Sequence, residues 1–354
     1  MTSMMDRPGV ILRYGARLDL SEATPRITLN EGSTPCIESR AVGPALGLRS
    51  LHFKFEGLNP TGSFKDRGMV VAVARAMERG SDTIVCASTG NTSASAAAYG
   101  ARFGLRTLVI IPTGHVAAGK LVQAQVHGAR VVAVEGNFDA ALRAVRSLCE
   151  GSTATLVNSV NPARIAGQKT AAFEIVDELG DAPDVLAIPV GNAGNITAYW
   201  RGFREYFDEG LSRRLPRMVG GQAAGAAPLV TGYAVERPET IATAIRIGNP
   251  ASWTQALVAR DESEGLIDSV SDDQICLAQR ELATSEGIFC EPASAASLAV
   301  LVQSLERGRV DRGSRVVCVL TGNGLKDTGA VSGALITPRV VGGGRDELAD
   351  LLGL

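Results

Sequence analysis

Short apolar runs alternate with amphipathic segments along most of this chain, and this alternation limits its possible folds more than any other feature. The expected strands are at 51–55, 83–87, 107–111, 131–134, 185–190, 218–221 and 315–320. The expected helices between them are at 65–79, 93–103, 117–127, 137–148, 163–179, 195–207, 272–285 and 292–305. Strands that alternate with helices are typical of parallel sheets with helices on both faces, so we predict an α/β fold. Residues 10–14 are a further strand candidate, residues 34–37 look like a turn, and 223–269 is expected to be irregular with short helices.

The segment SFKDRG (63–68) stands where one of these helices begins. Ser63 and Asp66 have the spacing of a capping box, which predicts a helix start here. Lys65 would then lie in the first turn, where the positive helix end and nearby Arg67 both lower the pKa of its ammonium. A lysine that forms a Schiff base must be a neutral amine. The simpler interpretation is a solvated lysine at a helix start.

Composition excludes several classes of protein. The 354 residues suffice for a large core and more than one domain, and the formal net charge of −2 gives no reason to expect a nucleic-acid partner. No apolar run approaches the ~18 residues of a membrane span. The six cysteines are scattered singly and the three histidines lack metal-ligand spacing, so we expect reduced thiols in a cytoplasmic protein without a metal site.

The loop GNAGN (191–195) joins an apolar strand to the next helix. In open parallel sheets ligands bind at such strand-to-helix loops. Glycines allow close approach of the backbone, and the free N–H groups and dipole of a helix start favour an anion. The loop matches neither GxGxxG nor a P-loop, so a small phosphate is the expected ligand. A tight turn with asparagine caps is the alternative.

Three other loops of this kind carry polar side chains. Residues 88–93 could present several hydrogen-bond donors to a carboxylate. The simpler interpretation is a helix N-cap that has more hydroxyl groups than capping requires. Asn158, Ser159 and Arg164 surround another helix start. Arg164 could form a bidentate pair with a phosphate or a carboxylate, or could be a surface arginine. Thr321 offers one neutral hydroxyl at a strand end, or simply ends the strand. Together with Lys65 these loops supply what is needed to hold pyridoxal phosphate and an amino acid.

Six stretches resemble the fold-type II pyridoxal-phosphate enzymes and, within them, the threonine synthases. They are NPTGSFKDRGM (59–69), ASTGNTSAS (87–95), NSVNPARIAGQKT (158–170), PVGNAGNI (189–196), GIFCEPASAAS (287–297) and LTGNGLKD (320–327). The related dehydratases typically have a run of glycines at the phosphate loop, which this chain lacks. The resemblance extends over roughly 34–326 and implies two open, mainly parallel α/β/α sheet domains.

The resemblance also implies roles for individual residues. The implied cofactor contacts are Phe64, Lys65, Asn91, Gly191, Asn192, Ala193, Gly194, Asn195 and Thr321. Lys65 would be the catalytic residue that holds the cofactor, Asn91 would bond its 3′-oxygen, and Thr321 its ring nitrogen. The implied substrate contacts are Ser88, Thr89, Thr92, Asn158, Ser159 and Arg164, the last three at the substrate phosphate.

The activity implied by the resemblance converts O-phospho-L-homoserine and water to L-threonine and phosphate. A homodimer is implied, with a small domain (56–155) that carries Lys65 and the carboxylate loop, inserted into a large domain (1–55 and 156–354). The main alternative is a threonine or serine dehydratase of the same fold, which needs no pocket for a substrate phosphate. A non-catalytic protein that binds a phosphate ligand is a further alternative, but such a protein would not require Lys65. A plain nucleotide-binding protein is another, but this chain lacks the glycines of the nucleotide-binding fingerprint.

Overall fold

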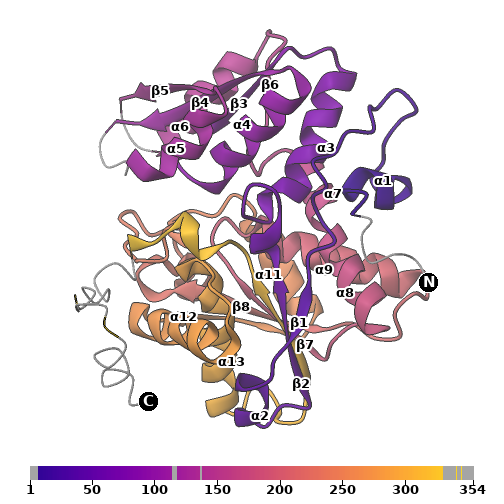
Figure 1. The fold of residues 1–354 in the computed structure, drawn as a ribbon, viewed down its shortest axis with the longest axis vertical. Coiled ribbons are helices and arrows are strands. Elements are labelled where there is room, and N and C mark those ends of the chain that lie inside the picture. Colours follow the sequence, from indigo (N-terminus) through magenta and orange to yellow (C-terminus); the bar gives the residue numbers. More distant parts are fainter. Residues whose placement is uncertain (1–6, 114–117, 136–137, 330–339, 341–343, 345–354) are drawn as a thin grey trace.

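The structure, a computed structural model, describes residues 7–113, 118–135, 138–329, 340 and 344. The expected domain ranges also include residues 1–6, 114–117, 136–137 and most of the chain beyond 329, which lie outside this description. The chain builds two sheets, one above the other in Figure 1, and helices flank both. No helix within these described ranges combines the length and apolar character needed to cross a membrane.

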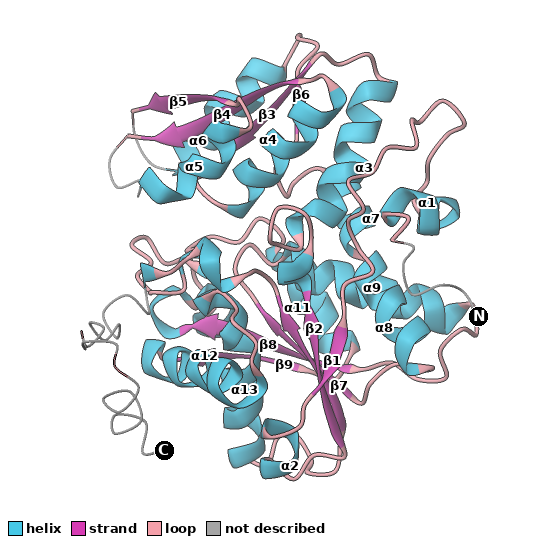
Figure 2. Cartoon of the chain, in the orientation of Figure 1, coloured by secondary structure: helices cyan, strands magenta, loops and turns pink. Residues whose placement is uncertain are grey.

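The larger sheet has six strands in the order β1-β2-β10-β7-β8-β9. These are β1 (Cys36–Glu38), β2 (Ser50–Phe55), β10 (Arg315–Leu320), β7 (Val185–Pro189), β8 (Arg217–Ala223) and β9 (Leu266–Val270). Only the β1–β2 pair among them is antiparallel. One face packs on α12 (Asp272–Glu286) and α13 (Pro292–Glu306), and the other on α8 (Thr170–Leu179), α9 (Gly194–Asp208) and α11 (Trp253–Glu262). Figure 2 shows this layered arrangement in the lower half of the molecule.

The smaller sheet has four parallel strands in the order β5-β4-β3-β6. They are β5 (Arg130–Val134), β4 (Arg106–Pro112), β3 (Thr83–Ala87) and β6 (Thr155–Leu156). Apolar side chains of α3 (Lys65–Glu78), α4 (Asn91–Phe103) and α5 (Ala118–Val126) share one core with this sheet. A second core on the sheet's other face contains α6 (Phe138–Cys149).

Short elements complete the described chain. The short α-helices are α1 (Val10–Tyr14), α2 (Val42–Ala45), α7 (Pro162–Gln168) and α10 (Pro228–Thr231). The 3-10 turns are η1 (Gly15–Arg17), η2 (Glu56–Leu58), η3 (Ala224–Ala226), η4 (Thr243–Ile245) and η5 (Gly324–Lys326). Of these, α7 packs against α3, which matters for the site described below.

The predicted α/β fold with mainly parallel sheets is confirmed, and β3 and β10 have the predicted bounds. The strand predicted at 10–14 is wrong: it is helix α1, whose buried Val10, Ile11 and Tyr14 share one helical face. The turn predicted at 34–37 is also wrong, because β1 forms an edge strand there. The helix predicted over 163–179 divides at Lys169 into α7 and α8, and the irregular stretch 223–269 contains α11 and β9.

Candidate active site

Lys65 lies where the two sheets meet. It begins α3, which packs on the four-stranded sheet, and the residues just before it bond to the loop after β10 of the six-stranded sheet. Phe64 N–H donates to the Thr321 carbonyl at 3.0 Å, and Asn323 N–H donates to the Gly62 carbonyl at 2.9 Å. The carboxyl end of β10 therefore lies beside Lys65, as expected for a ligand site in an open parallel fold.

The start of α3 is not stabilised by the predicted capping box. Phe64 is the N-cap residue and makes no side-chain cap. The Asp66 carboxylate instead accepts hydrogen bonds from Thr61 N–H (2.7 Å), Thr61 Oγ1 (2.6 Å) and Ser95 Oγ (2.6 Å). Burial raises the pKa of Asp66 to about 6, although these bonds favour its ionised form. The capping-box interpretation is therefore wrong: Asp66 ties the loop before Lys65 to α4.

The Lys65 amine favours its neutral form, as the sequence predicts, but for a different reason. Protein atoms surround the Lys65 side chain, although a small part of its surface is still exposed. This burial is the main cause that lowers its pKa to about 7. The positive charge of Arg164 lowers the pKa further, and the negative charge of Glu291 opposes both effects. The Lys65 Nζ lies 4.3 Å from the centre of the Phe64 ring.

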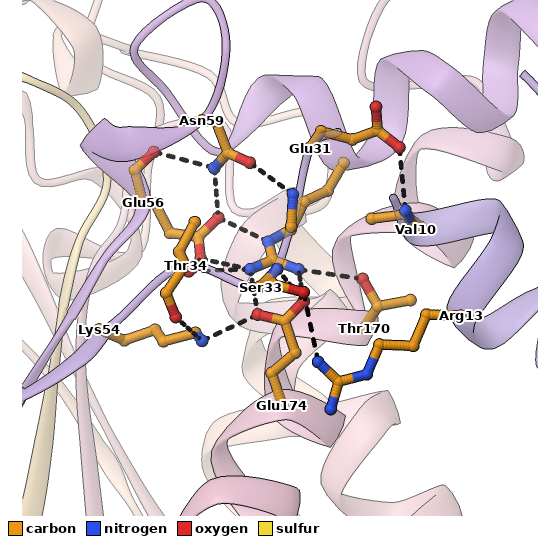
Figure 3. A network of polar contacts seen from close by, with 12 residues as sticks. Val10, Arg13, Glu31, Ser33, Thr34, Lys54, Glu56, Asn59, Thr170 and Glu174 are labelled. Atoms are coloured by element: carbon orange, nitrogen blue, oxygen red, sulfur yellow. Dashed lines mark hydrogen bonds and ion pairs between the residues drawn. The ribbon is translucent and has the colours of Figure 1, made fainter. Parts of the chain in front are cut away.

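Arg67 is not the cation that acts on Lys65, because its guanidinium is bonded within a buried ion network. Figure 3 shows Lys54, Glu56 and Glu174 of this network. The Arg67 Nε donates to Glu56 Oε2 at 2.6 Å, and its Nη2 donates to Glu174 Oε2 at 2.6 Å. Lys54 Nζ donates to the same Glu174 oxygen at 2.8 Å. These four side chains come from β2, η2, α3 and α8, so the network joins Lys65's helix to the six-stranded sheet and to a helix that covers it.

Asn91 and Thr321 meet a third residue that the sequence analysis did not single out, Glu291. Asn91 Nδ2 donates to the Glu291 carboxylate at 3.0 and 3.2 Å, and Thr321 Oγ1 lies 3.4 Å from Glu291 Oε1. Thr321 Oγ1 is also 2.9 Å from Ser294 Oγ. Burial raises the pKa of Glu291. The sequence contained one indication of Glu291: its carboxylate stands directly before Pro292, which begins the helix of EPASAAS.

The loop 191–195 leads from β7 into α9. Asn195 is buried, and neither its Nδ2 nor its Oδ1 has a hydrogen-bond partner among the described residues. Ala193 has a left-handed backbone, with φ of 63°, and the first N–H groups of α9 have no partner within the helix. Packing also requires a glycine at 191, since a β-carbon there would lie 2.8 Å from the Ile245 Cα.

Residues 88–93 and Asn158 meet at the end of β3. Asn158 Nδ2 donates to the Ala87 carbonyl and its Oδ1 accepts from Ala87 N–H, both at 2.8 Å. Ser88 Oγ accepts from Gly90 N–H at 3.2 Å. Ser88, Thr89 and Thr92 are partly exposed. Asn158 therefore holds the start of this loop through both ends of its amide.

Ser159 and Arg164 lie on the segment that follows β6. The Asn192 amide donates to Ser159 Oγ, which links this segment to the 191–195 loop. Arg164 is fully buried; its Nη1 donates to the Val157 carbonyl at 2.8 Å, while its Nε and Nη2 have no partner among the described residues. Burial lowers the pKa of Arg164 to about 10, so its guanidinium is a charged group with unmet hydrogen bonds at neutral pH.

Comparisons with known proteins show the family of the chain. The family model for "pyridoxal-phosphate dependent enzyme" matches residues 27–322. The threonine synthase of Halalkalibacterium halodurans is 58% identical over 94% of both chains, and that of Mycobacterium tuberculosis is 57% identical over 90% of this chain and 89% of the relative. The solved structure of maize serine racemase has a TM-score of 0.73 at 20% identity, over 89% of this chain and 92% of that one, which supports the fold. The chain therefore belongs to the pyridoxal-phosphate dependent enzyme family and, within it, groups with the threonine synthases.

Proposed function

We propose that this protein is a lyase of threonine biosynthesis that converts O-phospho-L-homoserine and water to L-threonine and phosphate. The likeness to threonine synthases over nine-tenths of the chain supports the reaction. The single structural observation that carries the proposal is the Lys65 amine between the two sheets, whose pKa is lowered to about 7. A lysine with a lowered pKa is the group that a pyridoxal-phosphate enzyme requires.

The residues present fit the cofactor. Asn195, near the start of α9, has a buried amide with no hydrogen-bond partner among the residues described, and the first N–H groups of that helix suit an anion. Thr321 offers a neutral hydroxyl rather than a carboxylate, and the Phe64 ring lies beside the Lys65 amine. When bound, pyridoxal phosphate withdraws electrons from the substrate's α-carbon and so makes its neighbouring protons acidic.

We infer the following roles for the cofactor contacts. Lys65 holds the cofactor, Asn91 binds its 3′-oxygen, and Thr321 binds its ring nitrogen. The group that contacts its ring is Phe64, and those that cradle its phosphate are Gly191, Asn192, Ala193, Gly194 and Asn195. The contacts already described support this assignment, since Asn91 of α4 and Thr321 after β10 both contact Glu291, whose charge acts on Lys65.

Lys65 also moves the protons of the reaction. Once the substrate has displaced it, its Nζ takes the proton from the α-carbon and releases that proton to solvent. The amine, neutral again, then takes a proton from the β-carbon as phosphate leaves the γ-carbon. Protonation at the γ-carbon, addition of water at the β-carbon and protonation at the α-carbon give L-threonine. One amine whose pKa is about 7 can accept and return protons at neutral pH.

The substrate's two anionic ends have separate candidate sites. Ser88, Thr89 and Thr92 bind its carboxylate, supported by their partial exposure on one loop. Arg164 binds its phosphate, supported by the Nε and Nη2 of its buried guanidinium, which have no partner within the described ranges. Asn158 and Ser159 support that pocket through their bonds to Ala87 and Asn192.

We further propose a cytoplasmic homodimer, which rests on the resemblance to the fold-type II enzymes. The two sheets favour two domains, a small one (56–155) and a large one (1–55 and 156–354). The 2.8 Å bond from Lys326 Nζ to the Thr61 carbonyl would then join the domains beside Lys65.

An absorbance spectrum of the purified protein, followed by a phosphate and threonine assay, tests the function. We expect a visible band of bound cofactor and, after addition of O-phospho-L-homoserine, equal amounts of phosphate and threonine. A band with a 2-oxo acid formed from threonine, and no phosphate release, would make the protein a dehydratase instead. No band after addition of pyridoxal phosphate would refute the role of Lys65.

A further inference from the structure

Glu291 connects the two halves of the candidate site. It is the N-cap residue of α13, which packs on the six-stranded sheet, whereas Asn91 begins α4, which packs on the four-stranded sheet. The Glu291 carboxylate is buried, and both of its oxygens accept from Asn91 Nδ2, at 3.0 and 3.2 Å. The contact therefore joins two elements that are 200 residues apart in the chain.

An ionised carboxylate can only accept hydrogen bonds, so it determines which end of the Asn91 amide faces it. Both short distances end on the same nitrogen, so one N–H is shared between the two carboxylate oxygens. The second N–H of that amide stays available for another acceptor. We propose that Glu291 is a positioning residue that fixes the Asn91 amide, so that this second N–H is available to the 3′-oxygen of the cofactor.

The backbone around Glu291 is shaped to admit its carboxylate. A β-carbon on Gly322 would lie 2.4 Å from Glu291 Oε1 and 2.9 Å from Oε2. Glycine at this position therefore leaves room for the carboxylate against the loop that follows β10. Because the clashing atoms are the end of a flexible side chain, Gly322→Ala would displace the carboxylate without changing its chemistry.

A second carboxylate, partly exposed rather than buried, offers a control. Glu286, at the end of α12, accepts from Ser39 Oγ at 2.5 Å and from Val42 N–H at 2.7 Å. Like Glu291 it accepts several hydrogen bonds, but it has no contact with Asn91 or Thr321. Glu286→Gln therefore reports the effect of losing a carboxylate that accepts such bonds elsewhere in the same half of the molecule.

The test measures pyridoxal phosphate binding by equilibrium dialysis, together with the absorbance band of the bound cofactor, in the full-length protein without substrate. We expect Glu291→Gln and Gly322→Ala each to weaken binding by about tenfold and to shift the band, because a charge-assisted hydrogen bond is lost. Glu286→Gln should bind as the wild type does. In an Asn91→Ala background, Glu291→Gln should have almost no further effect.

Two results would overturn the proposal: wild-type binding and an unshifted band in Glu291→Gln, or a full tenfold effect that persists without Asn91. The second result would mean that Glu291 acts on the site by another route. The proposal rests on the cofactor contact assigned to Asn91 in the proposed function. Its test needs no turnover. A protein that bound the cofactor but made no threonine would contradict the proposed reaction, and the binding measurement would still decide the role of Glu291.

Discussion

Gly68 and Arg164 are in contact across α3 and α7. A β-carbon on Gly68 would lie 2.6 Å from the Arg164 carbonyl oxygen and 2.7 Å from its Nε. On the facing helix, a β-carbon on Gly167 would lie 2.0 Å from the Arg67 carbonyl oxygen. These two glycines allow the helices to approach backbone to backbone, and so a buried guanidinium lies close enough to Lys65 to lower its pKa.

Gly68→Ala should therefore both destabilise the protein and change the site. The added methyl group must push α7 away or displace Arg164, and overpacking of this kind costs about 1–3 kcal/mol. Urea denaturation of the cofactor-free protein measures this loss. If Gly68→Ala were as stable as the wild type and left substrate KM unchanged, the close contact would have no functional importance.

Lys65→Ala should abolish turnover and the visible absorbance band, because no amine remains to hold the cofactor or to move protons. Lys169→Ala is a suitable control, since Lys169 pairs with Glu205 and has no contact with the site. We expect the control to keep both activity and the band. Full activity of Lys65→Ala in the phosphate-release assay would refute the assignment.

Arg164→Ala should raise the KM for O-phospho-L-homoserine far more than it weakens cofactor binding. Two of its nitrogens are buried and have no hydrogen-bond partner in the part of the chain that the structure describes, and a dianionic phosphate would satisfy them. Steady-state kinetics and equilibrium dialysis on the same preparation separate the two effects. An equal loss of both would instead assign Arg164 to the cofactor or to the structure of the site.

Much of this site was predictable because it depends on local patterns. Apolar runs predicted β3 and β10 with their observed bounds, and the polar residues after these strands lie next to the site because parallel strands align their carboxyl ends. Lys65 was singled out for its place at a helix start, which the structure confirms. Its lowered pKa was also predicted, although the wrong arginine was named.

What could not be predicted depends on long-range packing. Arg67 is two residues from Lys65 in the chain, yet its guanidinium is bonded to Glu56 and Glu174. Arg164 is distant in the chain and comes near Lys65 only because α7 packs against α3. Glu291 was missed for the same reason, because its importance comes from Asn91, 200 residues away. Nothing in the spacing of the sequence indicates such pairs.

The rate at which the cofactor-free protein captures pyridoxal phosphate should depend on pH with a midpoint near 7. Below its pKa of about 7 Lys65 is protonated and cannot attack the cofactor's aldehyde, and above it the amine is free. Arg164→Met should move this midpoint up by about one pH unit, because a neighbouring positive charge no longer opposes protonation. Stopped-flow absorbance measures the rate. A midpoint that stays near 7 in the variant would mean that burial alone lowers the pKa.

The buried network around Arg67 should make a large contribution to stability that is sensitive to acid. Burial alone would raise the pKa of Glu174, but Arg67 and Lys54 hold it well below its usual range. Because this carboxyl group is ionised in the folded protein down to a lower pH than in the unfolded chain, its contribution is present above about pH 4.5 and is lost as the pH falls further.

Arg67→Met would leave Glu56 and Glu174 buried without their common partner, and we expect a loss of about 3–5 kcal/mol in the free energy of unfolding. The exposed pair of Arg106 and Asp82 is the control, and Arg106→Ala should cost less than about 1 kcal/mol. Urea denaturation at pH 7 compares the two variants. Equal, small losses would contradict the view that this network joins Lys65's helix to the six-stranded sheet.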